Sequence, residues 1–577
     1  MVNVSINKTR MIVRGDNPDI MPLIAALIGS AHIDESDPSV MTCRASINNI
    51  RRIKRVVPDA KASTDENTKE AIAHFLAMEN DWKQGNGRLA SAKSGEAFGP
   101  SDYEFSFEPY NHQVLGYHWM HADRQTAIFG DCGIGKTAIA ASFLDSLKQM
   151  GQIGPECPAL VVCPIGIIKH AWIADLKKFT HNIKFISVYE PSGYKTAFKR
   201  MERLETPCDV YITSFSLLQI MEKQLRKKRF KIIIVDESTK IKNPQCKTYR
   251  SLREIAWKSE YRYVMSGTPS PNGPLDLWSQ FFFLDKGMTL EPSIVDFRHE
   301  HFKHIIVNTQ GAGFWVPRSG CAKSIYDMVK RRSVRFKASE CLDLPEKTFQ
   351  IREVSMTGKQ HKAYVDMAEN MFTELEGGET STARIPLSKL MKLREITGGF
   401  VITDSGDATP IGKNPKIDEL DGLLEQALAS GDHKAIVWIQ YQWEARTLLA
   451  RYKKGYRAVG LYGEIPQRQK DKNITSFMDD PRCKLLIAHP LSAGHGLTLT
   501  VASYCVYYSL SHNFEEFYQS SKRIHRSGQK KPCFYYFLVA MDSIDETLVT
   551  CIQDKKNMQD LLIDGKTDQR SIVGIRK

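Results

Sequence analysis

The stretch Gly130-Asp-Cys-Gly-Ile-Gly-Lys136-Thr137 decides the fold of this 577-residue chain. It matches the phosphate-loop pattern G-x-x-x-x-G-K-S/T at every fixed position, it follows an apolar run over 126–129, and it opens a helical pattern over 138–147. The glycines let backbone N–H groups turn towards phosphate oxygens, and the start of the helix adds a favourable partial charge. The sequence therefore predicts a strand, a loop and a helix that hold a nucleoside triphosphate.

Each fixed residue of the stretch has a chemical role in this prediction. Gly130, Gly133 and Gly135 allow the backbone to curve closely around the phosphates. Lys136 is expected to reach the β- and γ-phosphates of ATP, and the hydroxyl of Thr137 is expected to ligate Mg²⁺.

The acidic half of such a site is expected at the end of another apolar strand. Ile232-Ile-Ile-Val-Asp236-Glu237 supplies it, with Asp236 holding Mg²⁺ and Glu237 polarising the attacking water. Adjacent residues of a strand point to opposite faces, but where the strand ends the chain can aim both side chains at one site.

Two series of apolar runs surround these motifs, one over 159–265 and the other over 435–538. Runs that are apolar on both faces are typical of central strands in a parallel sheet covered by helices. The chain is therefore predicted to be an α/β protein with two lobes, at 105–284 and 411–577, and a largely helical region at 285–410 between them. No internal repeat is present.

The first part of the chain is predicted to form a separate unit. Residues 1–82 alternate short strand-like and helix-like segments, which indicates a small accessory α/β domain. Residues 83–104 are rich in Gly, Ser, Ala and charge, which is typical of a linker. The domain could bind DNA through Arg51-Arg-Ile-Lys54-Arg55, bind a protein partner, or brace the rest of the chain.

Composition narrows the partners and the compartment. Lys and Arg number 79 against 66 Asp and Glu, and a net charge of +13 fits either a nucleic-acid partner or a generally basic surface. The 12 cysteines form no C-x-x-C pair, which disfavours structural zinc and disulfides. No apolar run reaches the roughly 18 residues needed to cross a bilayer. A soluble intracellular protein without a membrane partner is expected.

Further motifs narrow the class of nucleotide-binding protein. They are Gln519-Ser-Ser-Lys-Arg523-Ile-His-Arg526-Ser-Gly528-Gln529, the Ile241-Lys242-Asn243 that follows the acidic pair, and Ser266-Gly-Thr268-Pro269 followed by Leu277-Trp278. With these motifs the sequence resembles superfamily 2 helicases, and within them the Swi/Snf-type DNA translocases, over about 107–562.

The resemblance implies two RecA-like lobes that clamp ATP between them. Arg523 and Arg526 stand three positions apart, so both can leave one helix face and act as arginine fingers. The remaining roles carried over from the family are ATP binding by Gln113, Gly496 and Gln519, coupling by Ser266 and Thr268, and DNA binding by Pro164, Thr213, Ser214 and Thr498.

The chain departs from the family pattern at two positions. Thr239 stands where the family usually carries His, which leaves the catalytic carboxylates intact but puts the local coupling hydrogen bonds in question. Thr498 stands where the family often carries Asn.

The expected function is ATP-driven movement along double-stranded or branched DNA, to remodel DNA structures or displace bound proteins, in a setting such as DNA repair or recombination. The alternatives are a strand-separating DNA or RNA helicase, a motor subunit of a restriction or recombination complex, and a nucleotide switch without turnover. A bacterial or viral origin is expected, with a cytoplasmic, nucleoid-associated location.

Overall fold

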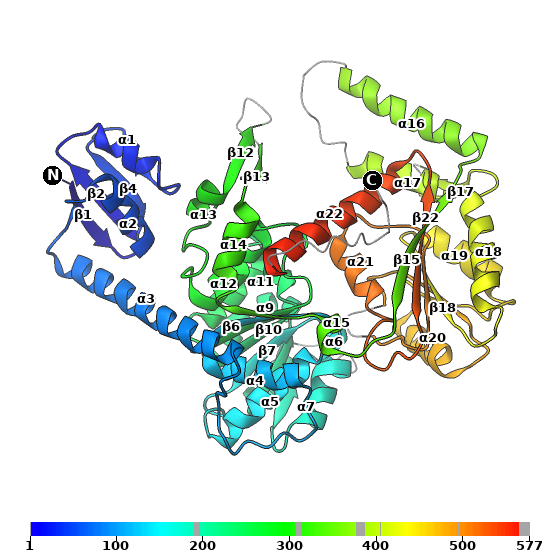
Figure 1. Cartoon of the computed structure of the whole chain (residues 1–577), viewed down its shortest axis with the longest axis horizontal. Coiled ribbons are helices and arrows are strands. Elements are labelled where there is room, and N and C mark those ends of the chain that lie inside the picture. The colour runs from blue at the N-terminus through cyan, green and yellow to red at the C-terminus, as the bar shows by residue number, and fades with distance from the viewer. Residues whose placement is uncertain are drawn as a thin grey trace.

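The computed structural model describes residues 2–189, 197–306, 313–376, 387–403, 406–493 and 497–564. Within them, two parallel sheets form the centres of two lobes, and a small domain precedes both (Figure 1). The predicted α/β fold with two parallel-sheet lobes is therefore confirmed. In the described ranges, no helix is both long and apolar enough to cross a membrane.

The first lobe contains a seven-stranded parallel sheet in the order β14-β6-β11-β10-β7-β9-β8. Alternate residues of its central strands enter two separate apolar cores, one on each face, so helices cover both sides. The strands are β6 (Gln125–Gly130), β7 (Ala159–Cys163), β8 (Phe185–Ser187), β9 (Val210–Ser214), β10 (Ile232–Asp236), β11 (Tyr261–Ser266) and β14 (Ser333–Phe336). The helices include α4 (Asn111–Ala122), α5 (Lys136–Gln149), α7 (Ala174–Phe179), α9 (Phe215–Ile220), α10 (Glu222–Lys228), α11 (Lys247–Ala256) and α12 (Leu275–Asp285).

The second lobe contains a six-stranded parallel sheet in the order β15-β22-β21-β18-β20-β19. Its strands are β15 (Lys347–Val354), β18 (Ala435–Trp438), β19 (Val459–Leu461), β20 (Leu485–Ala488), β21 (Tyr504–Tyr507) and β22 (Cys533–Ala540). Its helices are α18 (Pro415–Leu428), α19 (Gln442–Tyr452), α20 (Gln467–Asp479), α21 (Phe514–Ser521) and α22 (Ile544–Asp564).

The region between the lobes is less helical than predicted. Its strands β14 and β15 are edge strands of the two lobe sheets, and β12 (Phe302–Ile306) pairs with β13 (Gly313–Pro317) as a hairpin. Its helices are α13 (Ile294–His301), α14 (Cys321–Val329), α15 (Ala338–Cys341), α16 (Gly358–Glu376) and α17 (Leu387–Thr397), followed by the strands β16 (Phe400–Ile402) and β17 (Ala408–Pro410). Edge strands carry a mixed polar pattern, so they lack the continuous apolar signal that identified the central strands.

The N-terminal domain has a five-stranded mixed sheet in the order β3-β4-β2-β1-β5. Its elements are β1 (Val2–Asn7), β2 (Arg10–Gly15), α1 (Ile20–Ala25), β3 (His32–Ile33), β4 (Val40–Arg44), α2 (Ile47–Val56) and β5 (Lys61–Ala62). The 28-residue helix α3 (Glu66–Lys93) then leads from this domain to the first lobe (Figure 1).

Helix α3 corrects the predicted linker, because residues 83–93 are helical. Gly85, one of the glycines in that range, is a packing residue: a β-carbon on it would lie 1.9 Å from Oδ2 of Asp123. The same carboxylate accepts from Arg88 of α3 at 3.1 Å and pairs with the buried Arg332 at 2.7 Å. Gly85 thus lets the helix approach a buried charge cluster of the first lobe.

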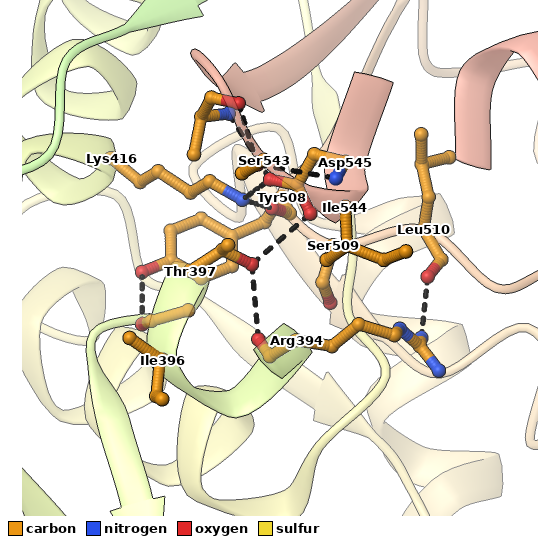
Figure 2. A network of polar contacts seen from close by, with 12 residues as sticks. Arg394, Ile396, Thr397, Lys416, Tyr508, Ser509, Leu510, Ser543, Ile544 and Asp545 are labelled. Atoms are coloured by element: carbon orange, nitrogen blue, oxygen red, sulfur yellow. Dashed lines mark hydrogen bonds and ion pairs between the residues drawn. The ribbon is translucent and has the colours of Figure 1, made fainter. Parts of the chain in front are cut away.

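Helix α22 connects the two lobes (Figure 1). Its last turn lies in the first lobe, where Leu562 and Ile563 enter the core and Asp564 pairs with Arg335 at 3.3 Å. Its first turn is held in the second lobe by Asp545, which pairs with the buried Lys416 at 2.6 Å and accepts from Thr397 at 3.1 Å (Figure 2). A single helix is therefore tied to both lobes by buried charges.

Candidate active site

The phosphate loop lies between β6 and α5, as the sequence predicted. Gly133 and Gly135 have φ angles of 89° and 84°, a left-handed conformation that side chains with a β-carbon rarely adopt. The ammonium of Lys136 donates to the carbonyl oxygens of Gly130 at 2.7 Å and Asp131 at 3.2 Å, so it lies within the curve of the loop. Thr137 follows it, half-buried, in the first turn of α5.

The acidic pair lies at the end of β10. Asp236 is 4% exposed, and its Oδ2 accepts from the indole N–H of Trp172 at 3.0 Å. Glu237 has a φ of 54°, so the backbone turns out of the strand at this residue. This turn is the physical means by which neighbouring carboxyls can serve one site.

Burial dominates the electrostatics of this pair. It raises the pKa of Asp236, and it raises the pKa of Glu237 to about 7, while the charge of Lys136 opposes both shifts. Two carboxyls beside one ammonium suit Mg²⁺, which is commonly held by one or two carboxylates together with substrate phosphates. The described residues contain no group of three or more His, Cys, Asp or Glu that could hold a metal ion.

Two arginines of the second lobe reach this site. A β-carbon on Gly133 would lie 3.1 Å from Cβ of Arg526 and 3.3 Å from its Nε, so Arg526 packs against the phosphate loop. Arg523 is 5% exposed, donates to the carbonyl of Leu497 at 3.3 Å, and lies close enough to Glu237 for their charges to interact. Burial lowers the pKa of both guanidinium groups. The structure thus brings together all five residues that the sequence predicted to be catalytic: Lys136, Asp236, Glu237, Arg523 and Arg526.

Asp131 joins the two lobes, and the sequence reasoning missed it. Its carboxylate accepts from the hydroxyl of Tyr518 at 2.6 Å and pairs with Lys522 at 3.0 Å and with Arg335 at 2.7 Å. Although burial alone would raise the pKa of Asp131, the charges of Lys522 and Arg335 hold it well below its usual range. Asp131 occupies a variable position of the phosphate-loop pattern, so only its partners in space reveal its role.

Thr239 makes hydrogen bonds at the position where the sequence departs from its family. Its hydroxyl lies 3.0 Å from the hydroxyl of Ser266 and donates to the carbonyl of Thr268 at 2.9 Å. The Thr268 N–H in turn donates to the Ser266 hydroxyl at 3.1 Å. The acidic segment and the segment with the predicted coupling residues are therefore linked through a threonine, and the coupling role remains a prediction.

Gln113 lies against the phosphate loop. Its amide oxygen accepts from the N–H of Tyr110 at 3.0 Å, and its amide nitrogen donates to the carbonyl of Ile134 at 3.3 Å. A β-carbon on Gly135 would lie 2.2 Å from that nitrogen. This amide is thus placed beside the nucleotide-binding loop, and its contact with adenine remains a prediction.

The residues expected to contact DNA are mostly buried. Thr213 and Ser214 are 0% and 1% exposed, and Pro164 is also buried. Their side chains do not reach the surface in this conformation, because they close the ends of central strands. Among the residues after Pro164, Ile165, Gly166, Lys169 and His170 are exposed, whereas Ile167 and Ile168 are buried.

The remaining predicted residues belong to the second lobe. Thr498 is half-buried, whereas Gly496 lies outside the described residues. Gln519 donates to Glu515 at 3.3 Å, and Glu515 pairs with Lys240 of the first lobe at 3.3 Å. Gln519 therefore lies on the helix face that meets the other lobe.

Two family models match the chain. The SNF2-related domain matches residues 112–398, and the helicase conserved C-terminal domain matches residues 415–528. Together they cover the phosphate loop, the acidic strand and both arginines.

Three known proteins illustrate the similarity. Protein p41 of Acyrthosiphon pisum secondary endosymbiont phage 1 is 27% identical over 475 residues, 80% of this chain and 98% of that protein. The ATP-dependent DNA helicase DDM1 of Arabidopsis thaliana is 24% identical over 485 residues, 78% of this chain and 62% of that protein. The Sulfolobus solfataricus SWI2/SNF2 ATPase core in complex with dsDNA is 22% identical, with 83% of this chain and 99% of that chain covered and a TM-score of 0.37. The chain thus spans nearly the whole phage protein and less than two thirds of the plant helicase.

Proposed function

Because this chain belongs to the Swi/Snf-type superfamily 2 proteins and is a DNA-dependent ATPase, we propose that it couples ATP hydrolysis to movement along double-stranded DNA. The observation that carries the proposal is the packing of Arg526, from the second lobe, on Gly133 in the phosphate loop of the first. Charges from both lobes meet around one loop, so hydrolysis depends on how the lobes sit relative to one another.

The contacts in the site indicate a separate role for each of its residues. Lys136 and the loop N–H groups bind the β- and γ-phosphates, and Glu237 orients the attacking water. Arg523 and Arg526 stabilise the charge that develops on the transferring phosphoryl group, because planar guanidinium groups bridge two oxygens. Thr137 and Asp236 would hold Mg²⁺, which when bound would neutralise part of the phosphate charge.

Movement requires that the nucleotide change the contact between the lobes. Opening and closing of lobes that each hold DNA would advance one lobe relative to the other. The hydrogen bonds of Thr239 with Ser266 and Thr268 connect the acidic segment to the end of the neighbouring strand β11. Through them, a change of the bound nucleotide can alter the contact between the lobes. We expect the grip to be mainly on phosphates, and therefore independent of sequence and sensitive to salt.

The biological task proposed for the motor is to remodel DNA structures or displace bound proteins. The relative named as an ATP-dependent DNA helicase supports DNA as the track. The phage protein, 98% of which is covered by the match, supports a viral setting. DNA repair or recombination is the process in which we propose that the motor acts.

The test is steady-state ATPase activity with single-stranded, double-stranded and branched DNA and with RNA, beside triplex-displacement and strand-displacement assays. We expect duplex DNA to stimulate turnover and the motor to displace a triplex strand without separating the duplex. Lys136→Ala should abolish turnover and leave DNA binding measurable. ATPase activity that ignores added DNA contradicts the proposal, and strand separation without triplex displacement favours a strand-separating helicase.

A further inference from the structure

The basic run in α2 does not provide the surface that the sequence suggested. Arg51 pairs with Glu79 of α3 at 2.7 Å. Arg52 pairs at 2.9 Å with Glu291, and also with Glu300. Both carboxylates belong to the segment after α12, which packs on the first lobe through Leu290 and Phe297. These two arginines hold the N-terminal domain in place, and of this run only Lys54 and Arg55 remain exposed without such a pair in the described structure.

Other contacts fix the domain on the first lobe as well. Asp296 of α13 accepts from the backbone N–H of Ser30 at 2.7 Å and from the side chain of Asn49 at 3.2 Å. A β-carbon on Gly29 would lie 2.4 Å from Cβ of His299, which shows how closely the two surfaces approach. Any surface of the domain is therefore held in a defined position relative to the motor.

One face of the domain's sheet is covered and the other is open. Because side chains alternate across a strand, one set packs under the helices, with Val4, Met11 and Met41 among its buried members. The opposite set points away from that core, and its exposed members are Asn3, Asn7, Arg10, Arg14, His32, Arg44 and Lys61. We call this second set the open face.

The open face is positively charged. Arg10 lies directly opposite Arg44 in the sheet, and Asn3 lies between Arg14 on one neighbouring strand and Lys61 on the other. The five strands contain no Asp or Glu. Arg10, Arg14, Arg44 and Lys61 form no side-chain ion pair or hydrogen bond with any residue that the structure describes.

This arrangement points to a polyanion as the occupant. Like charges directly opposite each other destabilise a sheet, so the Arg10–Arg44 pair is costly unless an anion lies over it. The amides of Asn3 and Asn7, together with the hydroxyls of Ser5 and Thr42 on the same face, can add hydrogen bonds to phosphate oxygens. The chemistry that matches this face is the phosphate backbone of nucleic acid.

The composition of the open face favours duplex over single-stranded DNA. Proteins that bind single strands stack the bases on aromatic side chains. The five strands contain no Phe, Tyr or Trp, and His32 on the edge strand β3 places a single imidazole at the margin, so the open face offers mainly charge and hydrogen bonds. A duplex, whose bases are paired and whose phosphates are exposed, is therefore the form of DNA that this face suits.

We propose that the open face of the N-terminal domain binds a second duplex segment by its phosphates, while the two lobes act on the first. The proposal rests on the proposed motor function. Because the domain is fixed to the first lobe, the two DNA contacts act together, and their combined affinity favours branched DNA, which presents two duplex arms at once.

The test compares two full-length variants with the same loss of charge. In the first, Arg10, Arg14 and Arg44 on the open face are changed to Gln. In the control, the exposed Lys54, Arg55 and Lys69 of the same part of the chain are changed to Gln. Binding to a fluorescent three-way junction and to a linear duplex is measured over a series of salt concentrations, and ATPase activity is measured with saturating linear duplex.

We expect the open-face variant to bind the junction about tenfold more weakly than the unaltered protein. A plot of the logarithm of its association constant against the logarithm of the salt concentration should be less steep, by up to about three. The control should bind like the unaltered protein, and Arg→Lys changes at the three open-face positions should retain binding. Equal binding by the open-face and control variants, or no loss in the open-face variant, overturns the proposal. Duplex-stimulated ATPase near the unaltered level in both variants shows that the motor is intact, whereas failure of duplex to stimulate the unaltered protein counts against the motor itself.

Discussion

Arg526 in the second lobe lies over Gly133 in the phosphate loop of the first, with Nε 3.3 Å from where a β-carbon on that glycine would be. The two residues are 393 positions apart in the chain, and the lobes that carry them meet at the loop where ATP is expected to bind. A guanidinium in this position can act on a phosphate only while the lobes remain in contact. ATP hydrolysis is therefore expected to depend on the relative position of the two lobes.

We expect Arg526→Ala to lower the kcat of the DNA-stimulated ATPase by about 10³–10⁵, because the charge that develops on the phosphoryl group loses its partner. Binding of a fluorescent ATP analogue should persist, since Lys136 and the loop are unchanged. Arg482→Ala is the matched control in the same lobe, because that guanidinium is 68% exposed and pairs locally with Asp480. Equal activity of the two variants contradicts the assigned role of Arg526.

We expect Asp131→Asn to weaken the contact between the lobes. The change leaves the charges of Lys522 and Arg335 without their common partner, and breaking a buried ion pair typically costs about 3–5 kcal/mol. ATPase activity and the thermal midpoint should both fall. Tyr518→Phe removes one hydrogen bond and should have a smaller effect, about 1 kcal/mol.

The double variant with Lys522→Met and Asp131→Asn separates this contact from a general loss of stability. Residues in direct contact show non-additive effects, so the double variant should lose less than the sum of the two single changes. Additive losses in both ATPase activity and thermal midpoint mean that Asp131 and Lys522 do not act together.

We expect Thr239→Val to uncouple DNA binding from hydrolysis. The substitution keeps the shape of the side chain and removes the hydroxyl that bonds to Ser266 and Thr268, at a cost of about 1–3 kcal/mol for the buried groups left without a partner. The ratio of ATPase rates with and without duplex DNA should fall, while Thr239→Ser, which keeps the hydroxyl, should preserve it. An unchanged ratio in the valine variant excludes this threonine from the coupling route.

We expect Asp545→Ala to destabilise the second lobe by about 3–5 kcal/mol, because Lys416 is left buried without its counter-charge. Figure 2 shows this ion pair. Both side chains are nearly inaccessible, with 2% of Lys416 and 7% of Asp545 exposed. Asp418→Ala is the comparison, since the Lys413–Asp418 pair is 75% and 49% exposed. Thermal unfolding measures both, and similar shifts in the two variants contradict the importance of the buried pair.

Local sequence patterns were sufficient to predict the two-lobed fold and the main motifs of the nucleotide site. The phosphate loop, the acidic strand end and the two series of central strands each carry their signal in consecutive residues. A loop that must adopt left-handed φ angles needs Gly133 and Gly135, and a strand buried on both faces needs an apolar run such as 232–235. Family motifs then named the residues of both lobes, and the structure brings the five predicted catalytic side chains together.

Features that depend on distant partners could not be predicted in the same way. The composition of residues 83–104 suggested a linker, yet Gly85 is a helical residue that makes room for Asp123 of the first lobe. The basic run at 51–55 suggested a DNA contact, yet its first two arginines pair with carboxylates of α3 and of the segment after α12.

The sequence by itself determined the chemistry of each half of the site, because backbone conformation and strand burial are set by neighbouring residues. Only the tertiary structure decided which charges meet, as in the contacts of Asp131 with Arg335 and Lys522 and in the open face of the first sheet. Electrostatic interactions act through space, and the energy of a charge depends on partners and burial that no local pattern records.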